Sequence, residues 1–404
     1  MEFTNKKVLF LVENLSVPFD KRVWLEALAL KKMGVKVFIV SPKGKEPGSD
    51  SNFEVIDGIE IYRYNCLIEA NRCCEYLLEY SMALICQFYL ACKIFLKHRF
   101  NVIHVSNPPD LMFLIGLVFK AFGVKFIFDQ HDLCPELYQA KTGKKGIFYK
   151  ILLLFEKFSF KTANIVISAN ESYKDIAMRN NRGGVLPRDV FVVRNAPQTE
   201  ILQQVVEQKM TYKKSAEYAI GYVGVMGKQD SLNYLLNAAR HLIYEKNMKN
   251  VEFILIGTGT EYSNIKNLAA QLGLGDFVIF TGMLPQIEAF RYLSACDVCV
   301  TPDEVNEYNA KSSKVKIFEY MALGKPIVQF DMDENRYMAQ GAALYAKPND
   351  YIDFAEKIYF LLNNDEIRGR MGNFGKNRIQ EHFQWKFSEK ELFKAYQQVF
   401  EPNS

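Results

Sequence analysis

The stretch KSSKVKIFEYMALGKPIV, residues 311–328, decides how this chain folds. It follows the apolar run DVCVT at 297–301, which is typical of a strand buried in a parallel sheet. The segment VKIFEYMAL at 315–323 has helical spacing, Gly324 ends this helix, and PIV at 326–328 begins the next strand. Strand, helix and strand in this order predict an α/β fold with a parallel sheet.

The start of this helix is predicted to be an anion site. Either Ser312 or Ser313 can cap the helix, whose free N–H groups and dipole point toward a ligand at the carboxyl edge of the sheet. Lys314 and Lys316 add positive charge, and Glu319 follows on the same helix, where a carboxylate can accept two sugar hydroxyls. Phosphate and diol together predict a nucleotide. The alternative interpretation is a helix with a buried face and one solvated glutamate.

Composition predicts a globular enzyme of two to three domains. The 404 residues suffice for large cores, and a chain with 49% hydrophobic and 24% charged residues is not disordered. A net charge of +4 is too small to indicate nucleic-acid binding. Eight cysteines without framework spacing, and an N-terminus that leads straight into a strand, predict a cytoplasmic protein. No apolar run reaches the roughly 18–20 residues of a membrane span, so we expect none.

Strand and helix patterns alternate along the first half of the chain. Buried strands are predicted at 8–13 and 35–40, a hairpin around Asp57-Gly58 at 53–64, and a helix over roughly 75–97. This βαβ alternation predicts a parallel sheet with helices on both faces.

The second half repeats the alternation. Six strand-like runs, each followed by a turn and a helix, predict a second doubly wound sheet. The less hydrophobic segment 198–216 is the predicted linker. We therefore expect an N-terminal domain at 1–200, a second domain at 217–385, and a terminal helical segment at 386–404.

The first loop, NLSVPFDKR at 14–22, follows the first buried strand. It lacks the G-x-G-x-x-G pattern of a dinucleotide fold, which argues against an NAD enzyme. Asp20, Lys21 and Arg22 are predicted at the carboxyl edge of the sheet, where Asp20 and Arg22 are candidates for the acceptor side. A solvated turn is the alternative for all three.

A second group of polar residues follows the strand that ends at Asp129. His131, Asp132 and Glu136 are predicted at the same edge of the sheet. A lone histidine is usually structural, but one that directly follows a buried strand and is flanked by aspartates is a catalytic candidate. Asp132 can orient the imidazole or bind an acceptor, and Glu136 is a further candidate for the acceptor side.

Glycine-rich turns follow two strands of the second half. The run YAIGYVGVMG at 218–227 is a strand followed by such a turn, and VEFILIGTGTE at 251–261 repeats the form. Gly257 and Gly259 allow close backbone approach.

The run FEYMALGKPIV at 318–328 carries a resemblance to a known family. It resembles the second half of the acidic motif of the retaining, GT-B-fold glycosyltransferases of family 4, many of which build bacterial surface polysaccharides. In that family two glutamates lie eight residues apart, and the second binds the ribose of a nucleotide sugar. Glu319 matches the second, whereas Lys311 stands where the first is expected.

The resemblance implies a fold and a set of site residues. Two Rossmann-like domains would face each other across a cleft, with the C-terminal helix crossing back to the first domain. His131 would lie near the donor sugar and the reacting centre, and the backbone at Gly282, Met283 and Leu284 would meet the base. The residues implied to contact the diphosphate or to position the donor are Gly224, Gly227, Lys228, Gly257, Gly259, Ser312, Ser313, Lys314, Lys316 and Glu319.

The function implied is the transfer of a sugar from a UDP- or GDP-linked donor to a saccharide or lipid-linked acceptor, with retention of configuration. Lys228, Lys314 and Lys316 would neutralise the leaving diphosphate, so no metal or other cofactor is expected. Three alternatives stay open. Asp331 and Asp333 form a D-x-D, which in other glycosyltransferases binds a divalent metal. The other two are a nucleotide-sugar 2-epimerase of similar architecture and a catalytically inactive sugar-binding partner.

Residues 141–161, KTGKKGIFYKILLLFEKFSFK, predict a peripheral contact with an anionic membrane. Read as a helix from Ile147, this stretch puts Lys150, Lys157 and Lys161 on one stripe, and the rest is almost continuously apolar. Such a contact would lie on the inner face of the plasma membrane. The alternative is a helix packed into the core with a solvated lysine edge.

Overall fold

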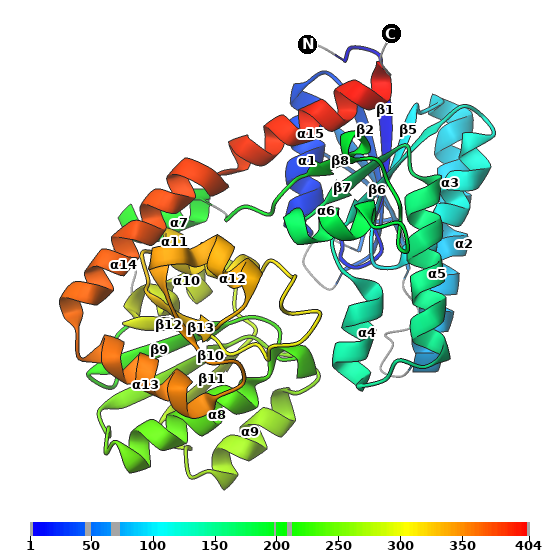
Figure 1. Cartoon of the computed structure of the whole chain (residues 1–404). Coiled ribbons are helices and arrows are strands. Elements are labelled where there is room, and N and C mark those ends of the chain that lie inside the picture. Colours follow the sequence, from blue (N-terminus) through cyan, green and yellow to red (C-terminus); the bar gives the residue numbers. More distant parts are fainter. Residues whose placement is uncertain (1–2, 45–49, 66–72, 198, 208–211, 402–404) are drawn as a thin grey trace. The chain divides into compact units, whose positions relative to one another are not determined.

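The computed structural model describes residues 3–44, 50–65, 73–197, 199–207 and 212–401. Its internal contacts divide the chain into two units (Figure 1). Unit 1 comprises Met1–Gln139, Lys144–Arg194 and Lys386–Ser404, and unit 2 comprises Ala140–Gly143 and Asn195–Trp385.

Unit 1 is built on a sheet that is parallel apart from one edge strand. Its described strands are rich in Val, Ile and Phe, which suit a sheet covered on both faces. In spatial order they are β3 (Phe53–Ile56), β4 (Ile59–Tyr64), β2 (Lys36–Pro42), β1 (Lys7–Leu11), β5 (Val102–Ser106), β6 (Lys125–Gln130), β7 (Ile165–Ser168) and β8 (Val190–Val192). Only β3 pairs antiparallel, with β4, so the predicted hairpin is confirmed.

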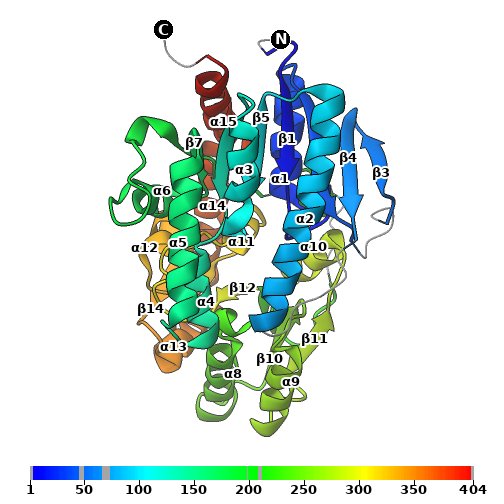
Figure 2. The same cartoon turned by 90° about the vertical axis from the view of Figure 1, so that its right-hand side faces the viewer.

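Helices cover both faces of this sheet. On one face lie α2 (Cys73–His98), α3 (Phe113–Lys120) and α5 (Ile147–Thr162), which share a core cluster with the inward side chains of β1, β2, β5 and β6 (Figure 2). The other helices of this part of the chain are α1 (Lys21–Lys32), α4 (Cys134–Thr142), α6 (Glu171–Met178) and α15 (Trp385–Phe400). The Tyr396 hydroxyl of α15 lies 2.8 Å from His104 Nδ1 of β5, so the C-terminal helix packs within unit 1.

Unit 2 is built on a second, wholly parallel sheet. Its described strands, in spatial order, are β11 (Val278–Gly282), β10 (Val251–Ile256), β9 (Tyr218–Val223), β12 (Val298–Thr301), β13 (Ile327–Phe330) and β14 (Ala343–Ala346). The prediction of six strands in this half is confirmed.

Two hydrophobic clusters cover the faces of the second sheet. One is formed with α8 (Leu232–Arg240), α9 (Tyr262–Gln271) and α13 (Tyr351–Leu362). The other is formed with α7 (Thr199–Glu207), α10 (Gln286–Ala295), α11 (Val315–Ala322) and α12 (Asp333–Ala339), and α14 (Asp365–Arg378) packs next to α11. Leu202 and Val205 of α7 are buried there, so part of the segment predicted as a linker is a packed helix.

Strand order sets where ligands can bind. In the first sheet the chain leaves β1 for β2 on one side and returns as β5 on the other, and in the second sheet β9 and β12 are related in the same way. Loops diverge at such switch points and leave a crevice at the carboxyl ends of the strands. The loops that follow β1, β5, β9 and β12 are therefore the ones to search for a site.

One expectation is corrected by α2. The segment Leu78–His98 within it is 21 residues long and apolar enough to cross a membrane by length and composition, and 28% of it is buried. The sequence pattern predicted a helix over roughly 75–97 and no membrane span, because a few polar residues interrupt its apolar run.

Candidate functional site

Two glycine turns meet at the switch point of unit 2. Gly224, after β9, and Gly257, after β10, have positive φ angles of 151° and 127°. A Cβ atom added to Gly257 would lie 1.9 Å from the Gly224 carbonyl oxygen, and one added to Gly259 would lie 2.6 Å from the Met226 carbonyl oxygen. The two loops therefore contact each other through bare backbone at Gly257 and Gly259.

The ammonium group of Lys316 lies beneath this turn. It is 3.4 Å from Asp230 Oδ1 and 3.5 Å from Asp303 Oδ1, and it donates to the Tyr222 hydroxyl at 3.3 Å. A Cβ atom on Gly224 would lie 3.4 Å from Lys316 Nζ. Burial alone would lower the pKa of Lys316, but Asp303, the Tyr222 hydroxyl and Asp230 outweigh it and hold this pKa well above its usual value. Lys316 is therefore a permanent cation.

The start of α11 differs from the prediction. Lys314 occupies the N-cap position and no side chain caps the helix. Ser312 donates to the Tyr308 carbonyl oxygen at 2.9 Å, and Ser313 donates to Glu334 Oε1 at 2.6 Å. The expectation that a serine caps this helix is wrong, because both hydroxyls have other partners. The end of the helix is as predicted, with Gly324 at a φ angle of 71°.

Lys314 also takes part in this cluster. Its ammonium donates to Asn309 Oδ1 at 2.8 Å and lies 3.9 Å from Asp303 Oδ1. Asp303 is wholly buried, and within the described residues its Oδ2 atom has no hydrogen-bond partner. Two lysines and two carboxylates thus balance each other, so an added diphosphate meets no excess of positive charge from these side chains.

Glu319 lies on the same helix, next to α10. Gln286 Nε2 donates to its Oε1 at 3.5 Å. Burial raises the pKa of Glu319 to about 7, against the opposing effects of Gln286 and Lys316. The carboxylate form that accepts hydroxyl groups is therefore populated only near and above neutral pH.

The remaining donor-site candidates lie on the same edge of unit 2. Lys228 is exposed in a 3-10 turn, Lys228–Asp230, and Gly227 precedes it with its N–H donating to Asp230. Gly282 ends β11 with a φ angle of 71°, Met283 is 72% exposed, and Leu284 packs against the core. The turn after β11 thus presents backbone groups and the exposed Met283 side chain, which a loop that contacts a nucleotide base needs.

A buried ion pair occupies the corresponding edge of unit 1. Arg22 Nη2 donates to Asp129 Oδ1 at 2.7 Å, and Arg22 Nη1 donates to the Val193 carbonyl oxygen at 2.6 Å. Burial alone would raise the pKa of Asp129, but Arg22 and His131 outweigh it and hold this pKa well below its usual value. Arg22 was predicted as an acceptor-side candidate at this edge, yet its side chain is buried in this pair.

His131 shares the same carboxylate. Its Nε2 atom lies next to Asp129 Oδ2 and 2.8 Å from Arg22 Nε, and a single nitrogen cannot donate to one and accept from the other at once. Its side chain is 18% exposed. The tautomer that donates from Nε2 to Asp129 leaves Nδ1 as an acceptor, which is the geometry of an oriented imidazole.

Glu26, His104 and Asp129 offer metal-type ligand atoms within 4.8 Å of one another. Burial and the Asp129 carboxylate raise the pKa of Glu26 well above its usual value, and burial lowers the pKa of His104. Arg22 Nε lies 3.3 Å from both Glu26 Oε1 and Asp129 Oδ2. The guanidinium is thus the cation of this cluster, and the cluster is a structural ion-pair network.

Two other acceptor-side candidates have structural roles. Asp20 caps α1, with its Oδ1 accepting from the Val23 N–H at 3.2 Å. Glu136 is buried, with Arg182 Nη1 donating to its Oε1 at 2.6 Å. The expectation that Glu136 is free to bind an acceptor is wrong, because a carboxylate buried next to an arginine must stay paired. Asp132 is half-buried beside His131.

Asn107 is one of the site residues that the sequence pattern did not reveal. Its Oδ1 accepts from the N–H groups of His131, at 2.6 Å, and Asp132, at 3.0 Å, and its Nδ2 donates to the Asp132 carbonyl oxygen at 2.8 Å. Asn107 follows β5 at the switch point of unit 1, and that position was the available signal. The sequence pattern also did not reveal Asp230, Asp303 and Gln286. Their partners, Lys316 and Glu319, come next to them only in the folded chain.

The D-x-D alternative receives no support from the geometry. Asp331 forms a bidentate ion pair with Arg336, five residues on, and Asp333 is exposed in the first turn of α12. The group of three ligand-type side chains found in the described part of the chain lies in unit 1.

Comparison with known proteins finds that this chain is similar to glycosyltransferases. Residues 217–364 match the model of the family described as Glycosyl transferases group 1. The chain is 24% identical over 247 residues to an uncharacterized glycosyltransferase of Methanocaldococcus jannaschii, covering 60% of each. It is 26% identical over 216 residues to the lipopolysaccharide core biosynthesis glycosyltransferase LpsD of Rhizobium meliloti, covering 53% of this chain and 58% of that protein. The matches thus span about 60% of these relatives.

Solved structures show the fold. The sucrose-phosphate synthase of Thermosynechococcus elongatus aligns with a TM-score of 0.79 and 18% identity, over 98% of this chain and 100% of that one. Anabaena HepE, solved in complex with UDP-glucose, aligns with a TM-score of 0.69 and 13% identity, over 96% and 99%. The fold is GT-B, with two Rossmann-like units, and unit 2 contains the segment that matches group 1 glycosyltransferases.

We predict that Gly257→Ala destabilises unit 2 by about 2–4 kcal/mol, from backbone strain at positive φ together with the clash at the Gly224 carbonyl oxygen. Gly275→Ala is the matched control, since a Cβ atom there meets nothing within 4 Å. Calorimetry of the full chain measures both. Equal stability of the two variants would show that the turns can separate at little cost.

We predict that Arg22→Met costs about 3–5 kcal/mol, because it leaves Asp129 buried and unpaired. Lys32→Met, on the same helix, breaks the exposed pair with Glu389 and should cost less than about 1 kcal/mol. Since the pair lowers the pKa of Asp129 in the folded state, its contribution is present above about pH 4 and is lost as the pH falls through the folded-state pKa. Urea unfolding at neutral and acid pH tests this, and similar losses for both variants would contradict it.

Proposed function

We propose that this protein is a glycosyltransferase that moves a sugar from a nucleotide-sugar donor to a saccharide or lipid-linked acceptor in polysaccharide biosynthesis. The observation that carries the proposal is the buried Lys316 cluster at the switch point of unit 2, inside the segment that matches group 1 glycosyltransferases. Glycine turns, a helix N-terminus and a nearby glutamate give this edge the groups that a nucleotide diphosphate needs.

The donor is proposed to bind unit 2 through three kinds of contact. The exposed Lys228 and the free N–H groups at the start of α11 face the diphosphate, Glu319 accepts the ribose hydroxyls, and the turn at Gly282–Leu284 meets the base. Lys316 acts as a fixed cation beneath the Gly224 turn, since its own carboxylate partners keep it in place. HepE was solved with UDP-glucose, which supports a UDP-linked donor.

Transfer is proposed to proceed with retention and without an enzyme nucleophile. The bond from the anomeric carbon to the diphosphate oxygen breaks on the face where the acceptor oxygen bonds, and the acceptor proton passes to the leaving phosphate. Asp230 and Asp303 are tied to Lys316, which argues against a pair of carboxylates for double displacement. His131, held by Asp129, is proposed to contact the donor sugar near the reacting centre.

A divalent metal is not required in this proposal, because the exposed Lys228 and the N–H groups at the start of α11 are proposed to supply the positive charge that the diphosphate needs. The proposed setting is the cytoplasm, where nucleotide sugars are at hand. LpsD, named for lipopolysaccharide core biosynthesis, supports a saccharide on a lipid carrier as the acceptor.

The test is a donor screen with EDTA present. Incubation with UDP- and GDP-linked sugars and a lipid-linked oligosaccharide acceptor should release nucleotide only when the acceptor is added, and EDTA should leave the rate unchanged. Isomerised nucleotide sugar without acceptor would indicate an epimerase instead. If EDTA abolishes turnover and Mn²⁺ restores it, the metal-free proposal fails.

We predict that nucleotide affinity depends on Glu319 and on pH. Because the pKa of Glu319 is about 7, UDP or GDP should bind about tenfold more weakly for each pH unit below that value, as the carboxyl group becomes protonated. In Glu319→Gln the affinity should be weak at all pH values between about 6 and 8. Titration calorimetry measures both, and an unchanged affinity in the folded variant would remove the ribose role.

His131→Ala is the contrast variant for the same experiment. It should lower turnover and leave the affinity for free nucleotide unchanged, since His131 belongs to unit 1. If turnover and nucleotide affinity fell equally, or if both stayed unchanged, His131 would have a structural role only.

A further inference from the structure

Three helices of unit 1 expose an apolar face to solvent. The outward side chains of α2, α3 and α5, together with the turn after α3, account for about half of the exposed large hydrophobic side chains in the described residues. Leu96 is 74% exposed, Ile85 and Ile147 are each 67% exposed, and Phe122 is 64% exposed. We name this the three-helix surface, defined by Leu78, Ile85, Phe88, Tyr89, Leu96, Leu114, Leu117, Val118, Phe122, Ile147, Phe148, Ile151, Leu154 and Phe158.

The three helices are neighbours, so the surface is continuous (Figure 2). Phe88 of α2 lies 6.3 Å, between ring centroids, from Phe119 of α3. Phe113 of α3 lies 5.5 Å from Phe158 of α5, and Lys120 Nζ donates to the Thr162 carbonyl oxygen at 2.6 Å. A monomeric soluble protein rarely exposes a contiguous apolar area of this kind without a partner.

The α2 helix lies in the plane of this surface. Its inner face is packed into unit 1, where Gln87 Nε2 donates to the Val12 carbonyl oxygen and to the Tyr64 hydroxyl, each at 3.0 Å. Ile94 and Phe95 are buried on the same side. Leu78–His98 is apolar enough for a membrane span because it has two apolar faces. One face packs on the sheet and the other is exposed. A helix fixed in this way can lie on a bilayer without crossing it.

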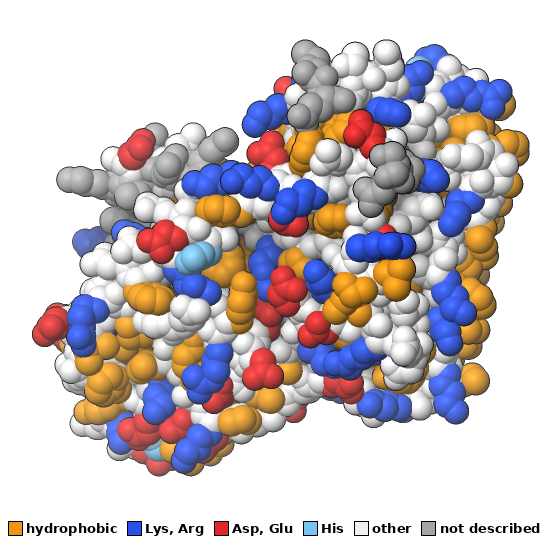
Figure 3. Space-filling model, turned by 45° about the horizontal axis from the view of Figure 1, so that its top comes forward, with side chains coloured by type: hydrophobic (Ala, Val, Ile, Leu, Met, Phe, Trp, Pro, Cys, Tyr) orange, Lys and Arg blue, Asp and Glu red, His pale blue; other side chains and the backbone are white. Residues whose placement is uncertain are grey.

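Basic side chains border the three-helix surface. Along α5, Lys144, Lys145, Lys150, Lys157 and Lys161 lie at its start or along one side, and Lys93 and Lys97 project from α2. In the described parts of the three helices from Leu78 onward, no acidic side chain is exposed, because Glu79 is half-buried and Glu156 is buried against Arg182. The right-hand edge of Figure 3 shows hydrophobic and basic side chains together, with the acidic ones farther in.

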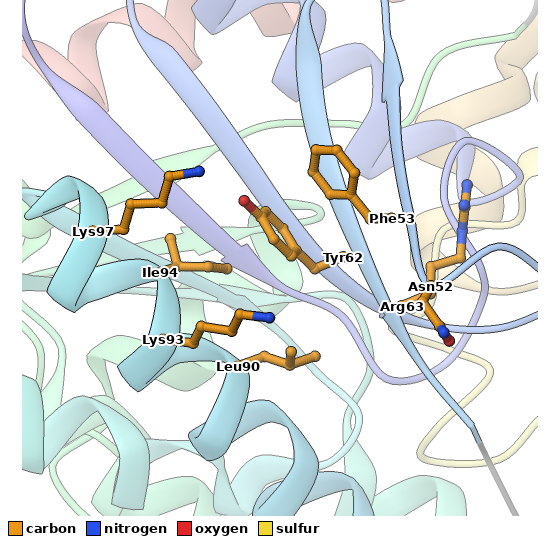
Figure 4. A pocket seen from close by; sticks show the side chains of 8 residues that line it. All are labelled: Asn52, Phe53, Tyr62, Arg63, Leu90, Lys93, Ile94 and Lys97. Carbon is orange, nitrogen blue, oxygen red and sulfur yellow. The ribbon is translucent and has the colours of Figure 1, made fainter.

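A cavity of about 410 Å³ adjoins this border, between α2 and the edge strands β3 and β4. Leu90 and Ile94 line it together with Lys93 and Lys97, and Figure 4 shows both lysines reaching from α2 toward Tyr62. Two ammonium groups beside an apolar surface suit the phosphate of a lipid headgroup, whose acyl chains would lie on the apolar side.

We propose that the three-helix surface docks unit 1 on an anionic lipid bilayer, with α2, α3 and α5 lying in the interface. Apolar side chains enter the acyl boundary while the bordering lysines meet the headgroups, which is how interfacial helices bind. The proposal extends the membrane contact predicted from residues 141–161 to three helices, and it does not depend on the transfer reaction. The alternative of α5 as a core helix with a lysine edge does not match its exposed stripe of Ile147, Ile151, Leu154 and Phe158.

The test is co-sedimentation of the full chain with vesicles of phosphatidylcholine alone or containing about a third phosphatidylglycerol, at low and high salt. Binding should require the anionic lipid and should be released by high salt, whereas a helix that spans the bilayer would resist salt. Lys144→Glu, Lys145→Glu and Lys150→Glu combined should lower the partition coefficient about a hundredfold, roughly fivefold per lysine. Ile151→Ser with Phe158→Ser should lower it at least about tenfold.

Matched controls keep the outcome interpretable. Lys266→Glu and Ile352→Ser alter exposed residues of the same types in unit 2 and should leave binding unchanged. Every changed side chain is exposed, and Phe158 also stacks on Phe113, so thermal unfolding should stay cooperative with at most a small loss of stability in the Phe158→Ser variant, and nucleotide binding should stay normal. Binding that ignores lipid charge, salt and the unit 1 substitutions would overturn the proposal. So would a stable dimer, seen by sedimentation velocity, that the Ile151→Ser and Phe158→Ser change dissociates.

Discussion

The candidate donor site depends on one buried ammonium. Lys316 contacts Tyr222 at the end of β9, Asp230 in the turn beyond it, and Asp303 after β12. A buried charge is stable only when it is paired, so this lysine fixes the two loops that diverge at the switch point. The bare glycine contact between the β9 and β10 turns follows from the same constraint, because the Gly224 backbone lies against the ammonium on one side and against Gly257 on the other. Contacts within the protein therefore set the shape of this edge.

A buried cation at the corresponding edge of unit 1, Arg22, pairs with the carboxylate that orients His131. Arg22 joins α1 to β6 and to the end of β8, and its partner Asp129 also holds His131. The carboxylate that stabilises the fold is thus the one that orients the imidazole. Asn107 adds a second restraint by accepting from two successive N–H groups of the same loop. Of the polar residues predicted at this edge, His131 and Asp132 keep partial exposure, while Arg22 and Glu136 are enclosed by the fold.

The sequence pattern predicted the features that depend on local chemistry. The spacing of apolar residues predicted both sheets, and the Asp57-Gly58 turn predicted the hairpin. Gly324 predicted the end of α11. It could not predict partners that come together only in the folded chain. Ser312 and Ser313 have the composition of helix caps but bond to Tyr308 and Glu334, and Glu136 meets an arginine 46 residues away. Charged residues in a polar loop look alike in sequence whether the fold buries them or exposes them.

The same limit explains α2. Periodicity reveals one apolar face of a helix, and a second face appears only as a general excess of apolar residues, which reads as a core helix or a membrane span. The structure separates these meanings, because Gln87 and Phe95 mark the face packed on the sheet and Ile85 and Leu96 mark the face left in solvent. Exposed apolar area of this size lowers solubility unless something covers it. Lysines border this surface, and no acidic side chain is exposed on the described faces of the three helices. A partner that binds here must therefore be both apolar and anionic, as the surface of an anionic lipid bilayer is.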